Sequence, residues 1–182
     1  MNICLFGAAS GLIDKKYAEA VTGLGEQIAE RGHTLIFGGG ATGLMGAAAL
    51  GAERRGGRII GVAPEFFREP GVLFERCTEM IYTETIGERI RIMEDRADCF
   101  VMAPGGVGTL QEFFDTVTLR QLGRIDKPIA AFNVCGYFDG LVSMLGHAAD
   151  ERFIDRAFLD TLGFFTDPAG LLEQLERECG AK

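Results

Sequence analysis

The chain has 182 residues, of which 47% are hydrophobic and 24% are charged. This composition excludes a largely disordered chain, and the length predicts a single domain over residues 1–182. The formal net charge of −8 argues against nucleic acid or an anionic membrane as the main partner, because both attract basic surfaces. A small phosphorylated ligand is compatible with this charge, since a few backbone N–H groups can bind it.

Short apolar runs alternate with helix-length amphipathic segments along the chain. The runs predict strands at 2–6, 34–37, 58–63, 78–82, 98–103 and 128–132. The amphipathic segments predict helices at 14–31, 43–56, 85–97, 109–122, 136–150 and 167–178, with an irregular connection at 64–77. Strands that alternate with helices favour right-handed βαβ units, so we expect an α/β protein whose mostly parallel sheet has helices on both faces.

The predicted helix at 85–97 has one apolar face. Ile86, Ile90, Met93 and Ala97 recur at helical spacing, and we expect all of them to pack on the sheet. Arg89 lies beside this apolar stripe. From the residues alone, Arg89 is interpreted as a solvated arginine paired with Glu88 or Asp95.

The stretch 34–52 carries no charge and is long enough to raise the question of a membrane-spanning helix. Glycines occur throughout it, three of them consecutive at Gly38, Gly39 and Gly40. Because glycine disfavours a helix interior, we expect a strand, a loop and a helix here, and no membrane partner.

The five cysteines indicate the compartment in which the chain works. Their number is odd, no two are spaced as Cys-x-x-Cys, and most lie in or beside apolar runs. This usage is typical of reduced thiols, so we expect a cytoplasmic protein without a zinc site. Residues 1–6 lack the basic segment that begins a secretory signal.

Glycine-rich loops directly follow the predicted strands at 2–6, 34–37 and 98–103. In an open parallel sheet these loops gather at the carboxyl ends of the strands, where ligands bind. Glycine permits close backbone approach, and each following helix presents unpaired N–H groups at the positive end of its dipole. We expect a phosphate or nucleotide ligand; the alternative for any single loop is a tight turn without a ligand.

The loop at 38–43 matches the pattern GxGxxG, which is weak support for a dinucleotide site and for a nicotinamide-dependent oxidoreductase. The P-loop pattern is absent, because no lysine follows a glycine. A lysine-dependent decarboxylase would have to rely on Lys127, which stands at the start of a predicted strand.

Thr109 and Glu112 open the helix that follows the loop at 104–108. One interpretation is a capping box, in which Thr109 caps the helix and Glu112 reaches back to the backbone. The other places the Glu112 carboxylate beside a phosphate-binding loop, where it binds ribose hydroxyls or activates water.

Two motifs together are far more specific than either alone. Gly-Gly-Gly-x-x-Gly-Leu-Met-Gly at 38–46 occurs with Pro-Gly-Gly-x-Gly-Thr-x-x-Glu at 104–112. The combination resembles the Lonely Guy family of cytokinin riboside 5′-monophosphate phosphoribohydrolases, long labelled possible lysine decarboxylases. Segments at 59–64, 121–123, 126–128 and 133–137 also resemble family segments in family order, so the resemblance covers nearly the whole chain.

The resemblance implies a Rossmann-like three-layer fold, a homodimer, and hydrolysis of a nucleoside 5′-monophosphate to free base and ribose 5-phosphate. It implies that Arg89 and Glu112 are the catalytic pair, with no metal or organic cofactor required. We expect the nucleotide to be bound by residues of the two glycine-rich motifs, namely Gly39, Gly40, Gly43, Gly105, Gly106, Val107, Gly108 and Thr109.

In the implied mechanism, Glu112 positions or deprotonates water and stabilises positive charge at the ribose. Arg89 holds the phosphate or assists the departing base. The sequence departs from the family pattern beside Arg89, where Gly87 replaces a histidine and Ile90 replaces a lysine. A non-catalytic protein that binds a nucleotide or another phosphorylated ligand is therefore the alternative.

Overall fold

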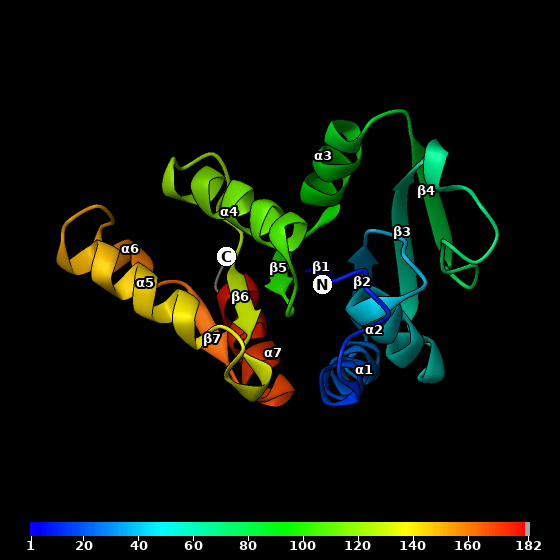
Figure 1. Cartoon of the computed structure of the whole chain (residues 1–182), viewed down its shortest axis with the longest axis horizontal. Helices are drawn as coiled ribbons and strands as arrows, with labels where there is room; N and C mark the ends of the chain where they lie inside the picture. The colour runs from blue at the N-terminus through cyan, green and yellow to red at the C-terminus, as the bar shows by residue number, and fades with distance from the viewer. Residues whose placement is uncertain (181–182) are drawn as a thin grey trace.

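The computed structural model describes residues 1–180, in which seven strands form one parallel sheet (Figure 1). The strands are β1 (Asn2–Phe6), β2 (Thr34–Phe37), β3 (Arg58–Pro64), β4 (Glu79–Thr83), β5 (Cys99–Met102), β6 (Ile129–Phe132) and β7 (Gly163–Phe165). Their order is β4-β3-β2-β1-β5-β6-β7, and every adjacent pair is parallel. The chain therefore winds outward in both directions from β1, which creates a switch point between β1 and β5.

The predicted helices are present, with shifts at some of their ends. They are α1 (Lys15–Glu30), α2 (Gly43–Arg54), α3 (Ile86–Arg96), α4 (Val107–Gln121), α5 (Asp139–Asp150) and α7 (Pro168–Gly180). The structure adds the short helix α6 (Arg156–Leu159), strand β7 and two single 3₁₀ turns, η1 (Glu65–Phe67) and η2 (Val134–Gly136). Helix α5 begins three residues later than expected, because Gly136, the first residue of the predicted range, has a left-handed φ of 69° that a helix does not allow.

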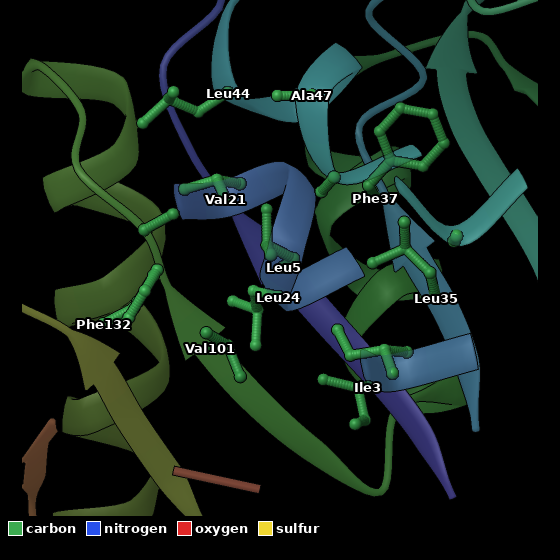
Figure 2. Close-up of a cluster of buried hydrophobic side chains, with 14 of the residues drawn as sticks. Ile3, Leu5, Val21, Leu24, Leu35, Phe37, Leu44, Ala47, Val101 and Phe132 are labelled. Carbon is green, nitrogen blue, oxygen red and sulfur yellow. The ribbon is translucent and has the colours of Figure 1, made fainter. Parts of the chain in front are cut away.

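Alternation along the strands divides the core into two layers. On β1, Ile3 and Leu5 pack against one set of helices, whereas Cys4 and Phe6 pack against the other. Figure 2 shows the first layer, in which Ile3 and Leu5 lie among residues of α1, α2 and the neighbouring strands. Both faces of the sheet are thus buried, which explains why its strands are almost continuously apolar and confirms the expected α/β, Rossmann-like architecture.

The second layer lies beneath α3 and α4, and it corrects one expectation. Met93 of α3 and Ala97, the residue that follows this helix, are buried in this layer as predicted, together with Phe113 of α4. Ile86 does not pack on the sheet; its exposed fraction is 52%. It is the first residue of α3, and the helix begins at the carboxyl edge of the sheet, beyond the reach of the core.

The uncharged stretch 34–52 forms β2, a loop and most of α2, as predicted. Within residues 1–180, no helix combines the length and the apolar character that a membrane crossing requires.

Helices α1 and α2 pack so closely that backbone meets backbone. A Cβ on Gly25 of α1 would overlap the carbonyl oxygen of Ala48, and a Cβ on Gly51 of α2 would overlap that of Thr22. Gly23 of α1, in contrast, has open space around the position of a Cβ. Within α1, the packing therefore excludes a side chain at Gly25 and leaves room for one at Gly23.

We expect Gly25→Ala to lower the free energy of unfolding by about 1–3 kcal/mol, because the added methyl group forces α1 and α2 apart. The matched control Gly23→Ala should raise it by about 1 kcal/mol, because alanine favours the helix and meets no neighbour. Urea unfolding followed by circular dichroism measures both changes. Equal effects of the two substitutions would contradict the close packing described here.

Candidate functional site

A cavity of about 560 Å³ lies at the carboxyl edge of the sheet, beside the switch point between β1 and β5. Its walls come from the loops after β1 and β2, the start of α2, the segment 67–73 and the facing turns of α3 and α4. The glycine-rich loops thus gather at one edge, as the parallel topology predicts.

Arg89 and Glu112 meet inside this cavity. Arg89 Nη1 donates a hydrogen bond of 2.7 Å to Glu112 Oε1, which joins α3 to α4. The two side chains are only 12% and 14% exposed. Arg89 Nε donates a second bond, of 3.1 Å, to the carbonyl oxygen of Val62 on β3. The guanidinium group is therefore held from two sides.

The interpretation of Arg89 as a solvated surface arginine is wrong. It is paired with neither Glu88 nor Asp95. Instead, Glu88 Oε2 accepts a bond from the backbone N–H of Glu84, and Thr85 Oγ1 accepts one from the N–H of Glu88. These bonds cap the start of α3, so the neighbouring acid is engaged there and not with Arg89.

The capping-box interpretation of Thr109 and Glu112 is also wrong. Helix α4 begins at Val107, with Gly106 as its N-cap, so Thr109 already lies inside the helix and is buried. Glu112 points to Arg89 instead of returning to the backbone. No side chain caps α4 within the described residues, and the first helical bond runs from Leu110 N–H to the Gly106 carbonyl. The amides of the first turn, before Leu110, are thus available to a ligand.

Helix α2 is different, because its N-terminus is already occupied by protein. The carbonyl oxygen of Ala8 accepts bonds from the N–H groups of Leu44 (2.8 Å) and Met45 (3.4 Å). Thr42 Oγ1 donates to the carbonyl oxygen of Ala9 at 2.7 Å. A dinucleotide fingerprint depends on open amides at this position, so the GxGxxG match no longer favours an oxidoreductase.

The predicted binding residues fall into two groups. Gly40, Gly106, Gly108 and Thr109 line the cavity together with Arg89 and Glu112. The residues outside the lining are Gly39, Gly43, Gly105 and Val107. Of these, Gly43 has a φ of 65° and packs against Ala8 and Ala9, whereas Gly105 accepts a bond of 2.7 Å from Tyr137 Oη. These two positions support the loops, and direct ligand binding by the outside group stays a prediction.

An apolar wall was missed in the sequence. It consists of five side chains from α2, the segment 67–73 and α3: Met45, Phe67, Val72, Leu73 and Ile86. The segment is attached to the loop after β2 by backbone bonds, from Ala41 N–H to the Val72 carbonyl and from Phe74 N–H to the Gly39 carbonyl. The available signal was a concentration of apolar residues in the irregular connection at 64–77.

Cys4 of β1 lies in the buried layer beneath the ion pair, and it offers no nucleophile. Its burial is complete, and burial together with the negative charge of Glu112 raises the pKa of its thiol well above the usual value. The thiol is therefore neutral at physiological pH and packs as a small apolar group.

A lysine-dependent reaction finds no support at this site. No lysine lines the cavity among the residues that the structure describes, and Lys182 lies outside them. Lys127 precedes β6 and donates a bond of 2.7 Å to the Glu94 carbonyl, at the opposite edge of the sheet. In residues 1–180, no three His, Cys, Asp or Glu side chains are grouped as metal ligands.

Comparison with known proteins identifies the family. The family model described as "Possible lysine decarboxylase" matches residues 45–175. A cytokinin riboside 5′-monophosphate phosphoribohydrolase of Mycobacterium tuberculosis is 41% identical over 144 residues, covering 79% of this chain and 77% of that protein. The chain belongs to the family that this model describes, of which the Mycobacterium tuberculosis protein is a relative. An Arabidopsis thaliana protein of the same description is 34% identical over 153 residues, covering 84% of this chain and 67% of its own. The resemblance found in the sequence is thus confirmed.

Solved structures outside this set of relatives share the fold. The molybdenum cofactor carrier protein of Chlamydomonas reinhardtii superposes with a TM-score of 0.74 at 24% identity, covering 100% of this chain and 98% of its own. The molybdenum cofactor binding protein of Rippkaea orientalis gives a TM-score of 0.72 at 20% identity, covering 97% and 94%. At these identities the likeness concerns the architecture alone.

Proposed function

We propose that this protein hydrolyses the N-glycosidic bond of a nucleoside 5′-monophosphate, of the AMP or cytokinin riboside monophosphate type. The products are the free base and ribose 5-phosphate. The observation that carries the proposal is the Arg89–Glu112 pair, which lies inside a cavity of about 560 Å³ next to the uncapped start of α4. The curated relatives bear the name of this activity.

The 5′-phosphate binds at the start of α4. The backbone N–H groups of its first turn, with Gly108 and Thr109 in the cavity wall, present hydrogen-bond donors and the positive end of the helix dipole. Gly106 leaves space for close approach, because nothing lies within 4 Å of the position of its Cβ. Binding energy from this remote phosphate can then be used at the reacting carbon.

Glu112 acts on water at the ribose. One carboxylate oxygen, Oε1, is bound to Arg89, and Oε2 makes no bond to the described part of the protein. Oε2 accepts a proton as the water oxygen bonds to C1′ of the ribose. The C1′–N bond breaks, its electron pair leaves with the base, and the base takes up a proton. The negative carboxylate also stabilises the oxocarbenium-like charge at C1′.

Arg89 has one free group for the substrate. Its Nε and Nη1 donate to Val62 and Glu112, whereas Nη2 makes no hydrogen bond within residues 1–180. Arg89 therefore has two roles. Its Nη1 orients Glu112, and its Nη2 is offered to the phosphate or to the departing base. The apolar wall, with Phe67, Val72 and Ile86, supplies the surface against which a base packs. This reaction uses no metal or organic cofactor.

We also propose that the working form is a homodimer. Leu12 and Val107 are 97% and 85% exposed, and each stands next to residues of the cavity wall. Apolar side chains exposed beside a site favour burial against another surface, and a second copy of this chain is the partner that the family resemblance implies. Sedimentation velocity should give about twice the monomer mass of 19.7 kDa. A monomer at micromolar concentration would exclude the dimer.

Incubation with AMP and a panel of nucleoside monophosphates, including cytokinin riboside monophosphates, should release free base and ribose 5-phosphate, detected by chromatography. Arg89→Ala should lower kcat/KM by at least about 100-fold, because Glu112 loses its orienting partner. Arg91→Ala, an exposed position on the same helix, is the matched control and should keep full activity. Saturable nucleotide binding without base release would indicate the non-catalytic alternative.

Glu112→Gln should lower kcat by at least about 100-fold while changing the dissociation constant of the nucleotide less than about 3-fold, since the amide keeps the shape but accepts no proton. Asp115→Asn provides the control, because Asp115 is exposed on the same helix and lies outside the cavity. Stopped assays give turnover, and isothermal titration calorimetry gives binding. Equal turnover by the wild type and Glu112→Gln would show that this carboxylate has no catalytic role.

A further inference from the structure

Gly38 stands at a position where β2, β3 and α3 converge. It follows β2 directly, one residue beyond the pair formed by Phe37 and Gly61 in the register of β2 and β3. The next residue on β3 is Val62, whose carbonyl oxygen accepts the Arg89 Nε bond. The guanidinium group therefore lies across the ends of β2 and β3, above Gly38.

The contact between Gly38 and Arg89 leaves no room for a side chain. A Cβ on Gly38 would overlap Arg89 Nη2 and would lie 3.0 Å from Cζ. The guanidinium group is planar and fixed by bonds to Val62 and Glu112, so it cannot turn away without breaking one of them. Met45 Sδ, at 3.1 Å from the same Cβ position, blocks another direction.

Backbone conformation does not explain this glycine. Its neighbour Gly39 has a left-handed φ of 79°, which favours glycine, but Gly38 lies outside the left-handed region. A side chain at Gly38 is thus excluded by the space that Arg89 occupies and not by the local dihedral angles.

We propose that Gly38 is a positioning residue, whose missing side chain sets how closely the Arg89 guanidinium approaches β2 and thereby aligns it with Glu112. This inference rests on the function proposed above, in which the aligned pair acts on the ribose. Gly38 contributes through Arg89, and its own atoms have no part in the chemistry.

The test is Gly38→Ala, compared with Gly87→Ala on α3, where the added methyl group meets nothing closer than 4.0 Å. Gly38→Ala should lower kcat about 100-fold and change KM less than about 3-fold, because misplacement by roughly 1 Å suffices for such a loss. Gly87→Ala should retain wild-type kcat. A crystal structure of Gly38→Ala should show the Arg89 Nη1–Glu112 Oε1 bond broken, and an intact bond overturns the proposal even if no nucleotide is a substrate.

A second background separates positioning from a general structural role. Lysine has no counterpart of Arg89 Nη2, the atom that a Cβ on Gly38 would overlap. In the Arg89→Lys background, the methyl group of Gly38→Ala therefore has more space. Adding Gly38→Ala to Arg89→Lys should therefore lower kcat less than about 3-fold, against about 100-fold in the Arg89 protein. Equal losses in both backgrounds overturn the proposal. If Gly38→Ala fails to fold, folding restored by Arg89→Lys supports it, and failure in both backgrounds contradicts it.

Discussion

The ion pair between Arg89 and Glu112 is the interaction on which the arrangement of the site depends. It joins α3 to α4 across the carboxyl edge of the sheet, and both side chains are largely shielded from solvent. A shielded pair is stable only when its geometry is good and its remaining groups are satisfied. Val62 supplies the extra acceptor, and Gly38 leaves the space. The neighbouring backbone is thus arranged around one guanidinium group.

The two glycine-rich motifs look alike in sequence but have different physical roles. The motif at 38–46 has a structural role. The Ala8 carbonyl accepts hydrogen bonds from the first amides of α2, and Gly43 packs against the loop after β1. The motif at 104–112 leaves its helix uncapped. One loop fixes the edge of the sheet, and the other keeps its amides free for a ligand. This division explains why the proposed phosphate site is at α4 and not at α2.

Much of the fold was predictable because both faces of a parallel sheet are buried, which makes its strands short apolar runs. Strand β7 was missed because the three residues Gly163–Phe165 are too few to show a pattern, and the four residues of α6 are also too few. Arg89 and Glu112 were identified through the family resemblance, since no local periodicity links residues on two helices. Helix periodicity misplaced Ile86, because the pattern does not reveal where the sheet ends. The apolar wall lies in an irregular segment, where no periodicity exists to be detected.

The wall segment is attached to the loop after β2 through main-chain atoms, at Ala41–Val72 and Phe74–Gly39. Bonds of this kind form whatever side chains the segment carries. In the proposed function this segment faces the base, and its side chains can therefore change while the main-chain attachment, the ion pair and the amides of α4 stay in place. The proposed function thus places most of the base-facing surface on the segment 67–73 and the reacting groups on α3 and α4, so a change in the segment leaves the reacting groups in place.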